Sequence, residues 1–192
     1  MNNTLFIQPQ TLKKICDSPN IKILDATFFL PDSGLDAEEE YKKKHIPNSI
    51  FFDINKIADP KNPLPHMIPS KEIFSMMMQN LGINNQDKII IYDNSPLLSS
   101  ARAWFLFRYF GHKNILILSG GLKNWEKNGG VITNKKTIIS KGDFINVIDI
   151  NQIYGPVTYI LKEITGSTIE SLKVVIYVNN NIFLLANVTK YL

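Results

Sequence analysis

The stretch Lys88–Gly111 reads KIIIYDNSPLLSSARAWFLFRYFG and predicts one strand, one loop and one helix. An apolar run that ends in a polar loop is typical of a buried parallel strand. The loop closes with two serines, either of which can cap a helix, and Gly111 stands where a glycine ends one. Open α/β sheets bind anions and carry out chemistry where a strand leads through a loop into a helix. The first residue of the loop, Asp93, is therefore the most informative candidate residue.

Composition and charge narrow the classes of function. The 192 residues are 44% hydrophobic and 20% charged, which is typical of a globular protein with a real core. The net charge of +4 comes from scattered lysines without an aromatic-basic motif, so we expect no nucleic-acid partner, whereas anionic small substrates suit the charge. The sequence has no apolar run near the ~20 residues that span a bilayer, and Met1–Thr4 does not resemble a signal peptide. We expect a cytoplasmic protein with no membrane partner.

The single cysteine, Cys16, excludes a disulfide framework or a thiolate metal cage within the chain. It falls on the apolar face of a helix predicted over residues 8–17, where a free cysteine usually acts as a small buried hydrophobe. The histidines His45, His66 and His112 are dispersed and have no cysteine partners. We therefore expect neither a metal nor a cofactor.

Strands and helices alternate as far as Asn134, which predicts an α/β fold with a central parallel sheet and helices on both faces. In the helix predicted over residues 70–82, Ser70 is the expected cap, and the apolar face is expected at Ile73, Met76, Met77 and Leu81. The expected strands are 4–7, 21–26, 50–53, 88–92 and 115–118, and the other expected helices are 8–17, 35–44, 101–110 and 122–128.

The alternation of predicted strands and helices becomes less regular after Asn134. Lys173–Val178 is strand-like and is similar to Lys88–Asp93, and Val147–Asp149 is a candidate strand before it. We therefore divide the chain into a domain of residues 1–134 and a tail of residues 135–192, a linker with the shortened remnant of a second, incomplete repeat.

Four motifs occur in order along residues 3–134. They are Ile23-Leu24-Asp25-Ala26, His45-Ile46-Pro47-Asn48-Ser49, Ile91-Tyr92-Asp93 and Gly120-Gly121-Leu122-Lys123-Asn124-Trp125. In this order and spacing they resemble the signatures of rhodanese domains, most closely the N-terminal half of two-domain thiosulfate and 3-mercaptopyruvate sulfurtransferases. The resemblance implies a rhodanese-like α/β fold. It also marks six residues as parts of structural motifs: Asp25, His45, Pro47, Gly120, Gly121 and Trp125.

The resemblance implies what a catalytic half would contain. A cysteine follows the central strand there, and its thiolate takes sulfur from thiosulfate or mercaptopyruvate and passes it to a nucleophile. Backbone N–H groups of the loop stabilise the thiolate and then the persulfide. At this position the chain has Asp93, as non-catalytic N-terminal halves commonly do, and in the tail Val178 stands at the matching position. The resemblance therefore predicts no catalytic residue and a chain that is inactive alone, so whether it is an enzyme stays open.

Arg102 follows the loop and is the one candidate for substrate binding. Arg102 can bind an anionic sulfur donor, or it can be a charge at an interface, and both interpretations stay open. The expected partners are such a donor or a cysteine-bearing rhodanese. The alternative function is a non-catalytic binding or regulatory module. A further interpretation is that the chain is a degraded product with no function. A phosphatase function on this fold is excluded, because that chemistry also needs a cysteine in the loop where Asp93 stands.

Overall fold

The computed structural model describes residues 5–146, 171–178 and 181–189. The chain divides into two compact units, Met1–Val147 and Ile148–Leu192, which we describe separately. Among the described residues, no helix is long and apolar enough to cross a membrane.

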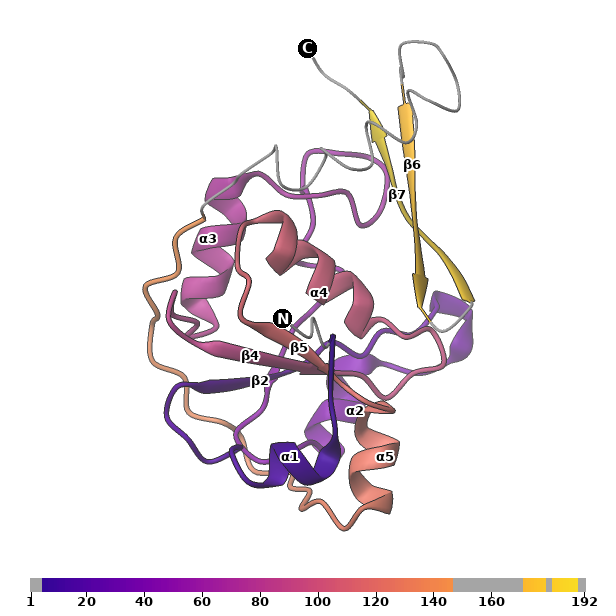
Figure 1. The fold of residues 1–192 in the computed structure, drawn as a ribbon. Helices are drawn as coiled ribbons and strands as arrows, with labels where there is room; N and C mark the ends of the chain where they lie inside the picture. Colours follow the sequence, from indigo (N-terminus) through magenta and orange to yellow (C-terminus); the bar gives the residue numbers. More distant parts are fainter. Residues whose placement is uncertain (1–4, 147–170, 179–180, 190–192) are drawn as a thin grey trace. The chain divides into compact units, whose positions relative to one another are not determined.

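A five-stranded sheet is the centre of the first unit, and all of its strands are parallel (Figure 1). The strand order is β1-β5-β4-β2-β3. The bounds are β1 Phe6–Ile7, β2 Ile21–Asp25, β3 Ile50–Phe51, β4 Lys88–Tyr92 and β5 Ile115–Leu118. The apolar run of β4 is completely buried because this strand is central and covered on both faces. The predicted parallel sheet is confirmed.

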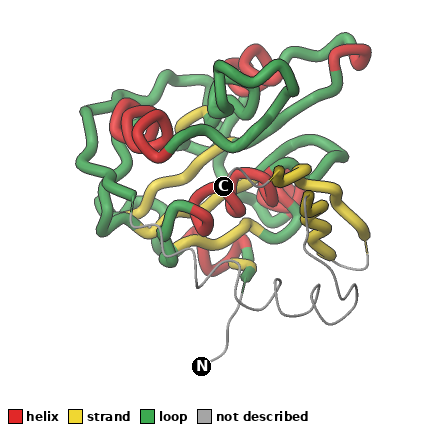
Figure 2. Tube along the Cα trace, turned by 90° about the horizontal axis from the view of Figure 1, so that it is seen from above, coloured by secondary structure: helices red, strands yellow, loops and turns green. Residues whose placement is uncertain are grey.

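Helices cover both faces of this sheet, as predicted. In Figure 1, α3 and α4 lie on one face, and α1 and α5 lie on the other. Much of the connecting chain is loop, shown in green in Figure 2. The helices are α1 Pro9–Lys13, α2 Ala37–Lys43, α3 Lys71–Asn80, α4 Ser100–Tyr109 and α5 Gly121–Lys127, with a short 3₁₀ helix, η1, at Pro31–Ser33.

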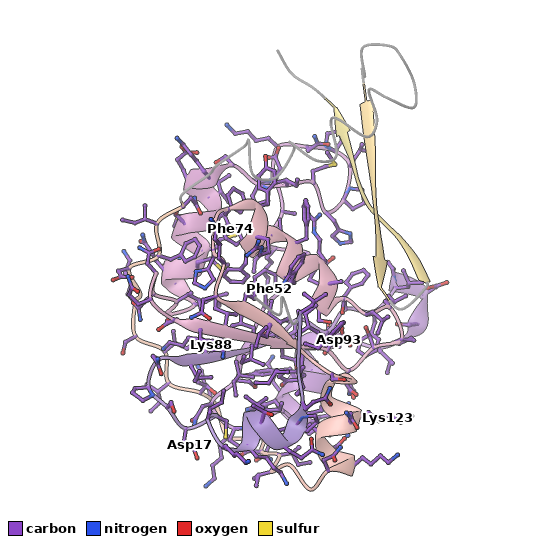
Figure 3. The ribbon with its side chains drawn as sticks, in the orientation of Figure 1. Asp17, Phe52, Phe74, Lys88, Asp93 and Lys123 are labelled. Carbon is purple, nitrogen blue, oxygen red and sulfur yellow. The ribbon has the colours of Figure 1, made fainter. Side chains whose placement is uncertain are left out.

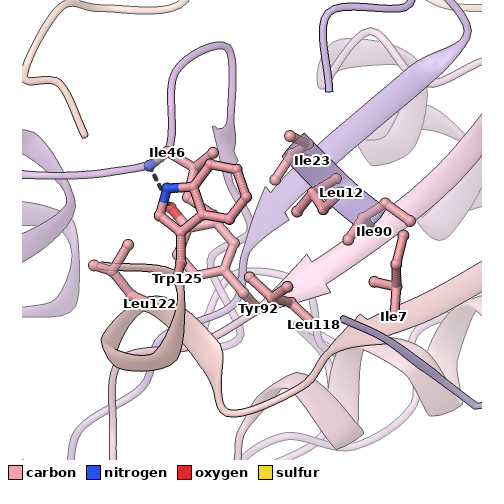
Figure 4. Packing of buried hydrophobic residues seen from close by; sticks show 9 residues of the cluster. All are labelled: Ile7, Leu12, Ile23, Ile46, Ile90, Tyr92, Leu118, Leu122 and Trp125. Atoms are coloured by element: carbon pink, nitrogen blue, oxygen red, sulfur yellow. Dashed lines mark hydrogen bonds between the residues drawn. The ribbon is translucent and has the colours of Figure 1, made fainter. Parts of the chain in front are cut away.

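The face of the sheet toward α1 and α5 holds an apolar cluster (Figure 4). Alternate strand residues point to it because side chains on a strand alternate between the two faces. Tyr92 contributes a polar group as well: its hydroxyl accepts a hydrogen bond from the Ile46 N–H at 3.2 Å. The nine buried members of the cluster are Ile7, Leu12, Ile23, Ile46, Ile90, Tyr92, Leu118, Leu122 and Trp125.

The opposite face carries a cluster of phenylalanines between the sheet, α3 and α4. Phe74 stacks on Phe110 with ring centroids 4.2 Å apart, and Phe107 meets Phe74 edge-on at 5.4 Å. Phe144 packs against both Phe74 and Phe107, at 5.7 and 5.9 Å. The chain at Phe144 therefore returns to this face, and residues 135–146, which were predicted to belong to the tail, are part of the first unit.

Some predicted details of the helices are wrong. The first helix ends at Lys13, and the chain then continues as turns. Cys16 therefore lies in a turn and not in a helix. Helix α3 has the predicted cap, Ser70, whose side chain accepts from the Ile73 N–H. Its buried stripe, however, is Phe74 and Met78, and Met76 is 52% exposed. The phenylalanine cluster sets this stripe, because Phe74 brings the larger apolar surface.

The described part of the second unit is an antiparallel hairpin of β6 Ser171–Val178 and β7 Asn181–Thr189. A strand over Lys173–Val178 is thus confirmed. At the end of this strand, Val178 pairs with Asn181 of β7. The candidate strand Val147–Asp149 lies outside the described residues. The interpretation of residues 135–192 as a linker with the shortened remnant of a second rhodanese-like domain stays a prediction.

Candidate functional site

Asp93 lies at the carboxyl end of β4, between that strand and α4, while Lys88 marks the other end of β4 (Figure 3). Its side chain is buried, and the backbone N–H of Ser100 donates to Oδ2 at 2.7 Å. The backbone N–H of Ser95 also hydrogen-bonds to this carboxylate. The carboxylate therefore occupies the place where the N-terminus of the ten-residue helix α4 favours an anion.

The serines at the end of the loop act differently from the prediction. Ser99 holds the cap position but makes no side-chain capping bond. Its hydroxyl instead donates to the Ala26 carbonyl oxygen at 2.7 Å, which ties the loop to the segment after β2. The capping interaction of α4 comes from Asp93, because the carboxylate is the stronger acceptor for a helix N–H.

The predicted glycine pair, Gly120-Gly121, lies against the backbone of Asp93. The Leu122 N–H, in the first turn of α5, donates to the Asp93 carbonyl oxygen at 3.0 Å. Gly121 has φ +58°, and a Cβ built on it would lie 2.3 Å from the same carbonyl oxygen. Gly120 before it has φ +71°. Only glycine therefore fits the close approach of α5 to Asp93.

Asp25 ends β2 beside this loop and is also buried. Its Oδ1 accepts from both the backbone N–H and the hydroxyl of Thr27. The Asn94 N–H in turn donates to the Thr27 hydroxyl at 2.9 Å, so the loops after β2 and β4 are connected. Thr27 was not among the predicted residues, although an Asp-x-Thr sequence after a strand is a known signal for a local side-chain-to-backbone turn.

Burial raises the pKa of both carboxyl groups above the ordinary value of 3.8. Hydrogen bonds from Thr27 act in the opposite direction at Asp25, as those from Ser100 do at Asp93. The charge of Asp93 raises the pKa of Asp25 further. The site is thus an acidic pair at the carboxyl ends of two adjacent strands.

His45 and Trp125 make structural contacts. His45 is buried; its Nδ1 lies 2.7 Å from the Tyr41 carbonyl oxygen and its Nε2 lies 3.1 Å from that of Lys135. Trp125 donates from Nε1 to the Val131 carbonyl oxygen at 2.8 Å. Pro47 is half-buried. The hydrogen bonds of His45 and Trp125 hold the backbone segments around Tyr41, Lys135 and Val131 in place.

Arg102 points into the proline-rich loop of residues 59–69. Its guanidinium is buried and donates to the His66 carbonyl oxygen, and burial lowers its pKa to about 10. His66 has φ +59°, and its Nε2 lies 2.8 Å from Asn55 Oδ1. The structure therefore pairs Arg102 with His66, which the sequence did not predict because the two residues are 36 positions apart.

Cys16 is not part of the Asp93 site. It is half-buried and packs against the apolar cluster on the α1 side of the sheet. Burial raises the pKa of its thiol, which disfavours the reactive thiolate. Val178 belongs to the second unit. Within the described residues, no group of three or more His, Cys, Asp or Glu side chains is arranged to hold a metal ion.

Both the sequence and the fold of the chain match those of known proteins. The family model of the rhodanese-like domain matches residues 8–128. The chain belongs to the rhodanese family. The fold agrees with this: the crystal structure of the 3-mercaptopyruvate sulfotransferase SseA from Escherichia coli aligns over 86% of this chain and 63% of that one, with a TM-score of 0.76 and 31% identity.

Curated relatives of this rhodanese chain are sulfurtransferases. The 3-mercaptopyruvate sulfurtransferase of Escherichia coli K12 is 36% identical over 145 residues, which are 75% of this chain and 52% of the relative. The mitochondrial thiosulfate/3-mercaptopyruvate sulfurtransferase 1 of Arabidopsis thaliana is 43% identical over 111 residues, which are 58% of this chain and 29% of the relative. The chain thus spans about half, or less, of the length of these relatives.

Proposed function

We propose that this chain is a non-catalytic, N-terminal type rhodanese domain of the thiosulfate/3-mercaptopyruvate sulfurtransferase class, which carries no persulfide itself. The observation that supports this proposal is the Asp93 carboxylate, which accepts hydrogen bonds from the loop N–H groups at the start of α4. An anion that is part of the chain already satisfies these donors.

The chemistry of sulfur transfer explains why this residue matters. A thiolate attacks the outer sulfur of thiosulfate, the S–S bond breaks, sulfite leaves, and a persulfide remains on the protein. A carboxylate is a poor nucleophile toward sulfur and forms no persulfide. The other position that resembles the nucleophile position in sequence is Val178, an apolar residue. Sulfur transfer then requires a cysteine-bearing rhodanese domain as partner and an anionic sulfur donor as substrate.

Intact mass spectrometry tests the proposal. The purified chain is incubated with thiosulfate, and separately with 3-mercaptopyruvate, and we expect no gain of a sulfur atom. Because Cys16 is the single cysteine, a sulfur gained by the wild-type chain and lost in Cys16→Ser would overturn the proposal. Cyanide-dependent formation of thiocyanate by the pure wild-type chain would overturn it as well.

A gain-of-function variant sharpens the test. In a Cys16→Ser background, Asp93→Cys places the only thiol of the chain at the start of α4, where the helix N-terminus lowers thiol pKa values. We expect this double variant to take up one sulfur atom from thiosulfate. The matched control is Cys16→Ser with Asp53→Cys, which places the thiol two residues after β3 and outside the loop between β4 and α4. Equal sulfur uptake by both variants would contradict the role given to the loop.

A further inference from the structure

A cavity of about 630 Å³ lies on the first unit, around the strap of residues 133–141 and the first residues of β2. We call it the basic cavity, because four lysines line it: Lys22, Lys135, Lys136 and Lys141. Lys22 stands near the start of β2, and the parallel register pairs Ile21 with Lys88, whereas Asp93 follows the other end of β4. The basic cavity is therefore distinct from the Asp93 site.

The strap is anchored at several points. Thr133 and His45 exchange two backbone hydrogen bonds of 2.8 Å, and the Thr137 hydroxyl donates to the Ser49 carbonyl oxygen at 2.7 Å. Further along, the Gly142 N–H donates to the Gln79 carbonyl oxygen at 2.8 Å. These contacts hold the strap before, within and after the lysine-bearing part. The cavity is thus largely formed before any ligand binds, as is usual for small-molecule sites.

Within residues 5–146, the lysine charges of the basic cavity are not balanced by ion pairs with carboxylates. One carboxylate, Asp17, is among the lining residues. Across residues 5–146, none of the four cavity lysines forms an ion pair, whereas Lys42 and Lys43 on α2 are paired with glutamates. Unneutralised charges of one sign around a concave surface focus the electrostatic potential and attract oppositely charged ligands.

The cavity also has an apolar part and suitable dimensions. Ile21, Pro47, Ile50 and Leu81 line it together with the lysines. Its volume falls within the range of about 300–1,000 Å³ that is typical of small-molecule sites. A ligand that matches both parts carries several negative charges on a flat or apolar body.

We propose that the basic cavity binds an organic phosphate of about nucleotide size, with the phosphates on the lysines and the organic body on the apolar lining. Lysine is a common phosphate ligand because its ammonium group is a compact point charge. This site is independent of sulfur transfer and of the function proposed for the Asp93 loop.

Calorimetric titration of the full chain with ADP tests the proposal. We expect saturable binding with one ADP per chain, and weaker binding of pyrophosphate and of adenosine, since each satisfies one part of the site. Lys135→Ala/Lys136→Ala should weaken ADP binding by at least about tenfold, because two charge-assisted contacts are lost. Both side chains are exposed, so their removal should leave the thermal unfolding midpoint unchanged.

The matched control is Lys123→Ala/Lys127→Ala, which removes the same charge from exposed positions of α5 outside the cavity. We expect this variant to bind ADP within about twofold of the wild-type chain, because distant surface charges are screened by salt. Absence of ADP binding at millimolar concentration would overturn the proposal. Equal weakening by the two double variants, or pyrophosphate binding as tight as ADP binding, would overturn it too.

Discussion

The Asp93 carboxylate and the Ser100 backbone N–H, seven residues apart in the sequence, are joined by a hydrogen bond of 2.7 Å. This contact closes the loop between β4 and α4 with an anion that belongs to the chain itself. The Leu122 N–H of α5 binds the backbone carbonyl of the same aspartate. One residue thus connects the central strand to the helices on opposite faces of the sheet.

Asp93→Ala should lower the free energy of unfolding by about 1–3 kcal/mol, because it leaves buried loop N–H groups without an acceptor. Asp93→Asn keeps an acceptor oxygen and should lower it by less than half as much. Chemical denaturation of both variants measures the difference. Equal losses for the two variants would show that the hydrogen bond contributes little.

Gly121→Ala should destabilise the fold by more than about 2 kcal/mol, since it combines a left-handed backbone with a backbone clash. The added Cβ would lie 2.3 Å from the Asp93 carbonyl oxygen. Gly34→Ala is the control: Gly34 has φ +70°, but a Cβ there meets nothing within 4 Å. A similar loss for both variants in denaturant titrations would mean that the close approach to Asp93 is easily relieved.

The pH dependence of stability should change in Asp93→Asn. The pKa of Asp93 is raised by burial in the folded state, so its contribution to stability is fully present below the ordinary value of 3.8. That contribution is lost as the pH rises through the folded-state pKa. The wild-type chain should therefore be more stable relative to Asp93→Asn at about pH 4 than at about pH 7. Denaturation midpoints of both proteins across this range check the sign, and the opposite trend would contradict the direction of the shift.

Arg102→Ala should release the proline-rich loop, because the Arg102 guanidinium donates to the His66 carbonyl oxygen within it. Limited trypsin digestion reports this change, since Lys61 lies in the same loop. We expect cleavage after Lys61 to be several times faster than in the wild-type chain. Arg108→Ala is the control, as Arg108 is exposed and its guanidinium donates to the Lys113 carbonyl oxygen. Unchanged cleavage in Arg102→Ala would show that the loop is held by other contacts.

Phe144→Ala should lower the free energy of unfolding by about 3–5 kcal/mol, the usual loss for a buried phenylalanine. Phe144 is 1% exposed and packs on Phe74 and Phe107. Ile138→Ala, at a side chain that is 95% exposed, should stay within about 0.5 kcal/mol of the wild-type value. A small effect at Phe144 would show that residues 135–146 are not part of the core of the first unit.

The sequence by itself determined the α/β alternation, the parallel sheet and the place of Asp93. These depend on local signals: an apolar run, a polar loop and glycines that end or approach a helix within a few residues. The family motifs follow from the same short stretches. Hence the strand, loop and helix of residues 88–111 could be predicted without the structure.

Only the tertiary structure decided which side chains meet. The contacts between Arg102 and His66, Thr27 and Asn94, and Phe144 and Phe74 join segments far apart in the sequence, and no local pattern encodes them. Helical periodicity likewise predicts an apolar stripe in α3, but the phenylalanine cluster decides that Phe74 and Met78 form it. The basic cavity exists for the same reason, because packing of the strap on the first unit brings Lys135 and Lys136 to the same cavity as Lys22.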